Sequence, residues 1–257
     1  MSENRLRLKN NSKIAIIGGG PAGSSAATHL ARSGIDVVLL ERAAFPRNQV
    51  GESLIPHIWK FTDMTGVSEK IRQEGFLAKA GGITVWDGKI HQILFSDFGY
   101  TRPGLHVERD VFDDILLKHA QSCGVRVFTE VAVKKADFSD VDQPEITYTD
   151  KRGDDNEEGC ICCEYVIDAS GHSSFLANQF RTRQTVSSRL NFLSLWGYYK
   201  NSRFVGVDRK SYPMEALSDI KPVTFVMSYE DGWVWHIVLR GNTSVGLIVH
   251  TDRTKRM

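Results

Sequence analysis

The 257 residues carry 32 lysines and arginines against 31 aspartates and glutamates, which leaves a formal net charge of +1. So weak a charge excludes the strong positive field of a dedicated nucleic-acid-binding protein, and no apolar run approaches the roughly 20 residues of a membrane span. Residues 1–12 are polar and lack the apolar core of a secretory signal. We therefore expect a disordered lead in a cytoplasmic protein.

The first predicted elements form a β-α-β unit within about thirty residues. Residues 13–17 (KIAII) are a short apolar strand, and residues 21–33 show the Ala and Leu spacing of a helix that Gly34 ends. Residues 35–40 (IDVVLL) are β-branched and apolar throughout, as in a buried parallel strand.

The rest of the chain mixes helices and strands. In chain order we predict helices at 54–65 and 67–74, a hairpin over 82–95 with an Asp-Gly turn, an amphipathic helix at 109–123, and strands at 125–129, 131–136 and 164–168. From about residue 193 the chain becomes β-rich. Three short strands at 223–229, 233–240 and 244–250, joined by glycine-containing turns, predict an antiparallel meander.

Cysteine usage favours reduced thiols. Cys160, Cys162 and Cys163 crowd one short segment, where neighbours on a strand point to opposite faces and pair poorly as disulfides. No second cysteine pair at metal-ligand spacing accompanies them, so we predict no metal site.

A glycine-rich turn follows the first strand. Gly18, Gly20 and Gly23 satisfy G-x-G-x-x-G, and Glu41 ends the second strand about twenty residues further on. In such a unit the first glycine allows the tight turn, the second lets the backbone approach a pyrophosphate, and the third permits close helix packing. Amide groups at the helix start meet the phosphates, while the acid accepts hydrogen bonds from a ribose. The turn therefore predicts dinucleotide binding.

Further motifs resemble those of the FAD-dependent monooxygenase-like superfamily, and within it the flavin-dependent halogenases. The run ER-x-x-FPR-x-x-x-GESL-x-P after the second strand, V-x-R-x-x-FD around Arg109 and DASG at 168–171 are similar to segments of those enzymes. The resemblance implies an α/β fold, with a Rossmann-like FAD-binding domain of the GR2 type and a partial antiparallel β substrate domain. It also implies the cofactor-binding residues Gly18, Gly19, Gly20, Ala22, Gly23, Glu41, Arg42, Arg47, Glu52, Ser53, Arg109, Asp168 and Gly171.

Lys79 favours a halogenase over a hydroxylase. It stands in G-F-x-x-K-x-G, where the resemblance implies the essential lysine of the halogenases. In those enzymes reduced flavin and O₂ give a hydroperoxide that halide attacks, and the resulting hypohalous acid must reach an organic substrate. A lysine ammonium can hydrogen-bond that acid or form a chloramine, and burial readily shifts a lysine's pKa. We therefore predict Lys79 as the catalytic residue.

Two tryptophans complete the resemblance. Trp233, Trp235 and Ile237 alternate in GWVWHIVL, so they point to one face of a strand. The run is similar to the halogenase motif W-x-W-x-I-P, which implies that the tryptophans are a barrier between substrate and flavin. Val238 replaces the proline of that motif.

The resemblance implies FADH₂-dependent halogenation of an electron-rich aromatic, phenol- or pyrrole-like, in secondary metabolism. The expected co-reactants are O₂ and chloride or bromide. The expected partners are a separate flavin reductase and an aromatic substrate that is free or tethered to a carrier protein, with neither nucleic acid nor membrane. Two alternatives stay open: an NAD(P)H-driven monooxygenase or geranylgeranyl-reductase-like enzyme, and an incomplete flavoprotein that acts as a binding module.

Domain boundaries follow from the same motifs. We expect the FAD-binding domain at 13–80 and 105–185, and the β-rich substrate part at 81–104 and 186–257. Family members normally continue past the meander with a G-D-A segment and a helical region, so we expect a chain truncated at its C-terminus.

Overall fold

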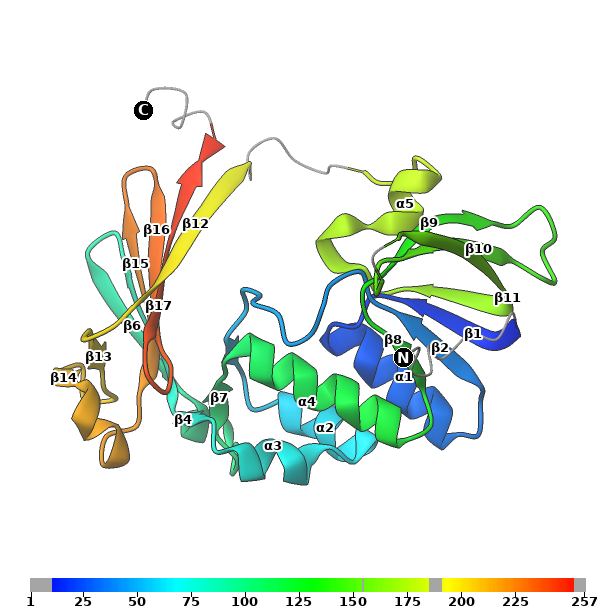
Figure 1. Cartoon of the computed structure of the whole chain (residues 1–257). Helices are drawn as coiled ribbons and strands as arrows, with labels where there is room; N and C mark the ends of the chain where they lie inside the picture. Colours follow the sequence, from blue (N-terminus) through cyan, green and yellow to red (C-terminus); the bar gives the residue numbers. More distant parts are fainter. Residues whose placement is uncertain (1–10, 154, 185–190, 252–257) are drawn as a thin grey trace. The chain divides into compact units, whose positions relative to one another are not determined.

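The computed structural model describes residues 11–153, 155–184 and 191–251, which divide into two compact units. Unit 1 comprises the described parts of Met1–Asn48, Met64–Val67 and Asp110–Gln184. Unit 2 comprises those of Gln49–Asp63, Ser68–Arg109 and Thr185–Met257. Each unit has its own six-stranded sheet, and Figure 1 labels the elements.

Unit 1 is a Rossmann-like α/β fold. Its sheet has the order β8-β2-β1-β11-β10-β9, in which β8, β2, β1 and β11 run parallel and β10 and β9 extend the sheet antiparallel. The elements are β1 (Asn11–Ile17), α1 (Pro21–Arg32), β2 (Val37–Leu40), α4 (Arg109–Ser122), β8 (Arg126–Phe128), β9 (Val131–Asp137), β10 (Glu145–Asp150), β11 (Glu157–Asp168), η2 (Gly171–Ser173) and α5 (Phe175–Gln179). The predicted α/β class is therefore confirmed.

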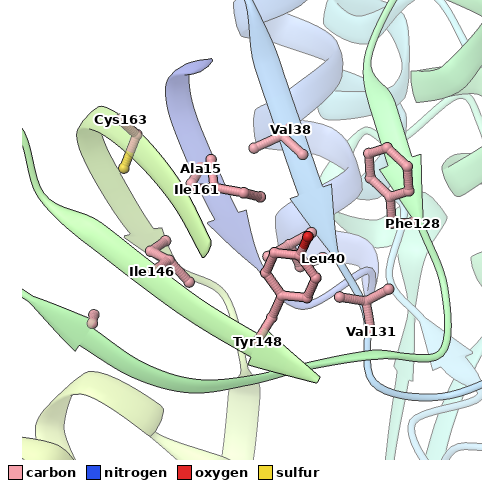
Figure 2. Packing of buried hydrophobic residues seen from close by; sticks show 10 residues of the cluster. Ala15, Val38, Leu40, Phe128, Val131, Ile146, Tyr148, Ile161 and Cys163 are labelled. Atoms are coloured by element: carbon pink, nitrogen blue, oxygen red, sulfur yellow. The ribbon is translucent and has the colours of Figure 1, made fainter. Parts of the chain in front are cut away.

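Alternation along the central strands fills a core on each face of this sheet. Ile14 and Ile16 pack in the core that α1 and α4 cover, whereas Ala15 between them packs in the opposite core. Figure 2 shows this second core, in which Phe128 and Tyr148 pack with Ala15, Val38 and Leu40. Because both faces are buried, the parallel strands appear in the sequence as continuous apolar runs.

Unit 2 is built on a sheet of order β12-β17-β16-β15-β5-β6, in which β15 and β5 run parallel and the other neighbours antiparallel. Its strands are β5 (Gly81–Trp86), β6 (Lys89–Leu94), β12 (Phe192–Tyr199), β15 (Val223–Tyr229), β16 (Gly232–Val238) and β17 (Thr243–His250). A small sheet joins β3 (Ser53–Leu54), β7 (Gly104–His106) and β4 (Leu77–Lys79). The remaining elements are α2 (Ile58–Thr65), α3 (Ser68–Glu74), η1 (Phe95–Phe98), β13 (Arg203–Val205), β14 (Ser211–Pro213) and η4 (Met214–Ser218).

Two local predictions in unit 2 are confirmed. Asp87 (φ 48°) and Gly88 (φ 73°) form the two-residue turn between β5 and β6, with the left-handed backbone that such hairpins need. The meander is present as β15, β16 and β17.

The helix expected at 54–65 begins only at Ile58. Ser53 and Leu54 instead pair with β7 as strand β3, and Pro56 disfavours a helical backbone at Ile55. The prediction of a helix start was therefore wrong by four residues, because the extended segment is fixed by a strand about fifty residues away.

Two further expectations concern the bounds of the parts. The disordered lead was expected at 1–12; residues 1–10 lie outside the described residues, and Asn11 and Ser12 begin β1. Residues 49–63, 68–80 and 105–109, which we placed with the FAD-binding domain, cluster with unit 2.

Candidate functional site

The glycine turn of unit 1 is too tight for side chains. Gly18 has φ 107°, and a Cβ there would lie 2.5 Å from the carbonyl oxygen of Ala169. A Cβ at Gly23 would lie 1.9 Å from the carbonyl oxygen of Gly18. Glycine at both positions lets α1 start immediately beside β1 and the end of β11.

The start of α1 is open to an anion. Gly20 is its N-cap residue and supplies no side-chain cap, and Pro21 is the first helical residue. The amide groups of the first turn, Ala22 among them, are therefore left for a ligand, which the helix dipole favours when it is negative. Arg47 adds positive charge: its Nη2 lies 3.4 Å from the position of a Cβ at Gly20. The buried carboxylate of Asp113 holds Arg47 there at 3.2 Å.

Glu41 supports the turn from the end of β2. It is buried, and its Oε2 accepts a hydrogen bond from the Gly19 amide at 2.7 Å. Its Oε1 accepts one from the Ala43 amide at 2.8 Å. Each carboxylate oxygen can accept a further bond, so these contacts leave room for the predicted ribose contact.

The DASG segment lies beside the turn. Asp168 ends β11, and its two carboxylate oxygens accept hydrogen bonds from the amides of Ser170 (3.0 Å) and Leu176 (2.8 Å). Asp168 thereby organises the loop into α5, in which Gly171 has φ 63°. Arg42, the remaining predicted residue of unit 1, is exposed.

In unit 2 the GES segment is held by two side chains. Arg109 donates hydrogen bonds to the carbonyl oxygens of Val50 (2.8 Å) and Gly51 (3.3 Å). Glu52 is fully buried, and its Oε1 accepts a hydrogen bond from the Tyr198 hydroxyl at 2.7 Å. Its Oε2 is buried with no hydrogen-bond partner among the described residues. A buried carboxylate oxygen in this state indicates a missing donor, such as one from a ligand.

Lys79, at the end of β4, is buried beside the same segment. Its Nζ donates a hydrogen bond to Ser53 Oγ at 2.6 Å and lies 5.2 Å from the centre of the Phe95 ring. Ser53 Oγ lies 2.7 Å from Thr224 Oγ1, which in turn lies 2.9 Å from Nε2 of His106. Burial lowers the pKa of Lys79 to about 8.

One face of the large sheet of unit 2 carries aromatic side chains. Directly paired residues share a face, and Trp196 pairs with Gly246, Gly246 with Trp235, and Trp235 with Val226. We call this the aromatic face; its members are Trp86, Phe192, Trp196, Trp233 and Trp235. Thr224 lies two residues before Val226 on β15, so the hydroxyl that bonds Ser53 lies on the same face.

Close contacts fix the tryptophans on this face. The Trp233 ring lies 5.0 Å from Phe192 and 6.1 Å from Trp86, centre to centre. Trp235 lies flat over β17, because a Cβ at Gly246 would be 2.0 Å from its ring. The predicted common face of Trp233 and Trp235 is therefore present, and Gly246 creates the space for one of them.

A comparison with protein families decides the identity of this arrangement. The family model described as FAD binding domain matches residues 11–228. The chain belongs to this FAD-binding family. FAD is therefore its cofactor, and the Rossmann-like fold of unit 1 agrees with that assignment.

The similar proteins include several halogenases. The chain is 35% identical to the tryptophan 2-halogenase of Chondromyces crocatus and 34% identical to the flavin-dependent halogenase armH1 of Armillaria mellea, each over 97% of this chain. It matches the crystal structure of CmlS, a flavin-dependent halogenase, with 33% identity and a TM-score of 0.80 over 97% of this chain and 43% of that one. The chain spans about half the length of the curated relatives, 45% and 47% of these two.

The residues of unit 1 fit the ADP end of FAD. The glycine turn excludes side chains, the first turn of α1 has free amides, and Arg47 supplies a cation beside Gly20. Of the predicted cofactor residues, the structure brings the glycine turn, Glu41 and Arg47 together in unit 1, and Glu52, Ser53 and Arg109 lie in unit 2. Within the part of the chain that the structure describes, no helix is long and apolar enough to cross a membrane.

Three contact residues escaped the sequence analysis: His106, Tyr198 and Thr224. His106 has no partner at metal-ligand spacing in the sequence, so nothing there marks it as a site residue. Thr224 bonds Ser53 across 171 positions, and Tyr198 bonds Glu52 across 146. Separations of this size leave no local pattern in the sequence. The available signal was indirect: Thr224 lies two positions before Val226, the residue that pairs with Trp235, so it shares the face of that tryptophan.

Proposed function

We propose that this FAD-binding chain carries out FADH₂-dependent halogenation of an electron-rich aromatic substrate, phenol-, pyrrole- or indole-like. The observation that carries the proposal is a buried lysine ammonium, Lys79, hydrogen-bonded at the edge of the aromatic face. The halogenase relatives support the same reaction. The glycine turn and Arg47 would hold FAD, which, once reduced by a separate reductase, would supply hypohalous acid from O₂ and halide.

Lys79 handles the oxidised halogen in this proposal. Its ammonium has three N–H groups; one is engaged by Ser53, and the others can donate to the oxygen of hypohalous acid. Such donation draws electrons from the halogen and promotes the reaction ArH + HOX → ArX + H₂O. With a pKa near 8, a fraction of Lys79 is neutral at pH 7, and the free amine can instead take up the halogen as a haloamine, releasing water.

The aromatic face supplies a wall for the substrate. Trp233 and Trp235 are only partly buried, so their rings offer flat apolar surface on which an aromatic ring can stack. Their predicted role as a barrier stays part of this proposal. Glu52 offers its unpaired Oε2 as an acceptor for a donor of the bound cofactor, and Arg109 fixes the backbone of the same segment.

The test is halide-dependent product formation. The chain is supplied with FAD, a flavin reductase, NADH and chloride or bromide, and is given phenols, pyrroles and tryptophan as substrates. Mass spectrometry detects a halogenated product by its isotope pattern. We expect the product with the wild type and a loss of at least about 100-fold in Lys79→Ala, with FAD binding unchanged. Lys60→Ala, which removes an exposed lysine on α2 of unit 2, is the control and keeps the activity.

Other outcomes would contradict halogenation and favour another function. Hydroxylated product without halide, or full activity of Lys79→Ala, contradicts halogenation through Lys79. Direct oxidation of NADPH by the pure chain without a reductase favours the monooxygenase or reductase alternative. FAD binding without any turnover favours the binding module.

A further inference from the structure

A chain of hydrogen bonds leads away from the Lys79 ammonium into the sheet. Lys79 Nζ donates to Ser53 Oγ at 2.6 Å, Ser53 Oγ and Thr224 Oγ1 are 2.7 Å apart, and Thr224 Oγ1 is 2.9 Å from Nε2 of His106. The four residues come from four strands, β4, β3, β15 and β7. Because two sheets contribute members, the chain is a tertiary feature and not a local turn.

The charge of the lysine fixes the first hydrogen bond: an ammonium can only donate, so Ser53 Oγ accepts from Lys79. The Ser53 hydroxyl proton is then free to donate to Thr224, and the Thr224 hydroxyl proton to His106 Nε2. In this order His106 is neutral and carries its proton on Nδ1, which is buried without a hydrogen-bond partner among the described residues.

The surroundings of His106 keep it neutral. The ring is fully buried, and desolvation lowers its pKa to about 3, with further lowering by the charges of Lys79 and His236; the backbone of Val238 acts in the opposite direction. Lys79 itself has its pKa lowered by burial alone. The positive charge of the cluster therefore resides on Lys79 and not on His106.

We propose that Ser53, Thr224 and His106 are positioning residues for Lys79: their aligned hydrogen bonds fix where its ammonium points and stabilise it in the charged form. His106 acts as the terminal acceptor, and Thr224 transmits that polarity to Ser53. Aligned hydroxyls strengthen one another as acceptors and donors in a low-dielectric site. This inference rests on the proposed function for its meaning in catalysis, but the hydrogen-bond chain is testable without it.

The experiment measures the protonation of Lys79 directly. The protein is labelled with ¹³C,¹⁵N-lysine, the Lys79 side-chain signal is assigned by its loss in Lys79→Arg, and its chemical shift is followed from pH 6 to 11. Thr224→Val removes the hydroxyl but keeps the shape, so we expect the acid dissociation constant of Lys79 to rise about tenfold, a fall of about one pKa unit. Ser53→Ala gives at least the same change, and Thr224→Ser restores the wild-type midpoint.

Two controls separate positioning from folding. Thr147→Val makes the same substitution on β10 of unit 1 and leaves the Lys79 midpoint in place. Tryptophan fluorescence and far-UV circular dichroism confirm that each variant is folded. If Thr224→Val and Ser53→Ala are folded and both retain the wild-type midpoint, the positioning chain is refuted.

Activity measurements distinguish this inference from the proposed function. If halogenation occurs, Thr224→Val lowers kcat with little effect on KM, and Thr224→Ser restores it. A shifted Lys79 midpoint in a protein that forms no halogenated product supports the hydrogen-bond chain and rejects the halogenase. If the Lys79 titration midpoint is unshifted in the variants but halogenation depends on Lys79, the hydrogen-bond chain is rejected and the halogenase function is retained.

Discussion

At the scale of single residues, the contacts of Glu41 predict how its substitution affects the stability of unit 1. Its two carboxylate oxygens accept hydrogen bonds from the buried amides of Gly19 and Ala43. Glu41→Gln replaces one oxygen by an NH₂ group, which then faces an amide donor. We expect a loss of about 1–3 kcal/mol in the free energy of unfolding, with weaker FAD binding. Urea unfolding followed by circular dichroism, and quenching of FAD fluorescence, measure the two effects.

The control for Glu41 is a glutamate of the same unit. Glu164 lies on β11 with more than half of its side chain exposed, and its contact with Lys13 spans 3.9 Å. Glu164→Gln should change the free energy of unfolding by less than about 0.5 kcal/mol. Equal stability of Glu41→Gln and Glu164→Gln would show that the carboxylate does not support the turn.

Residues of the site differ in how far the sequence could predict them. The glycines of the turn and Glu41 belong to one β-α-β unit, so their spacing carries the geometry. Lys79 was found only through a resemblance, because a single lysine near a strand has no pattern of its own. Thr224, which reaches Lys79 through Ser53, lies on a strand far along the chain, and only the tertiary fold brings it to Ser53.

At the scale of elements, the contact between β16 and β17 predicts the effect of substituting Gly246. Trp235 covers Gly246 so closely that an added Cβ would lie 2.0 Å from its ring, and its indole nitrogen donates to Ser244 at 3.3 Å. Gly246→Ala should therefore push the indole off the strand, at a cost of about 1–3 kcal/mol in unfolding free energy. The tryptophan emission should shift, because the ring moves to a different environment.

A glycine with free space gives the comparison. Nothing lies within 4 Å of a Cβ built at Gly241, in the turn before β17. Gly241→Ala should leave the emission maximum unchanged. If Gly246→Ala also leaves both the emission and the unfolding midpoint unchanged, Trp235 is not held against β17.

The elements themselves were predicted where the pattern is local. The Asp-Gly turn fixes the hairpin of β5 and β6, and regular turns separate the strands of the meander. Strands β10 and β12 were missed. β10 does alternate, with Ile146 and Tyr148 between threonines, so its pattern was readable but is only six residues long. β12 carries exposed aromatic and aliphatic residues on both faces, so it shows no clear alternation of polar and apolar residues. Their pairing with β11 and β17 decides their structure.

At the scale of the whole molecule, stability should depend on pH through Lys79. The ammonium has a pKa of about 8 in the folded state against an ordinary 10.5. Below pH 8 both states bind the proton, and the folded protein bears the cost of burying the charge. Between pH 8 and 10.5 the folded state loses its proton while the unfolded state keeps it, so the free energy of unfolding rises with pH.

Comparison with Lys79→Met isolates this effect, because all other titrating groups are shared. Between pH 7 and pH 10 we expect the wild type to gain about 2–3 kcal/mol relative to the variant. All five tryptophans (Trp59, Trp86, Trp196, Trp233 and Trp235) lie in unit 2 with Lys79, so urea unfolding followed by their fluorescence reports on the unit concerned. A difference between the two proteins that stays constant from pH 7 to 10 would mean that Lys79 has an ordinary pKa. Its ammonium would then titrate like that of an exposed lysine, and the haloamine route at neutral pH would lose its physical basis.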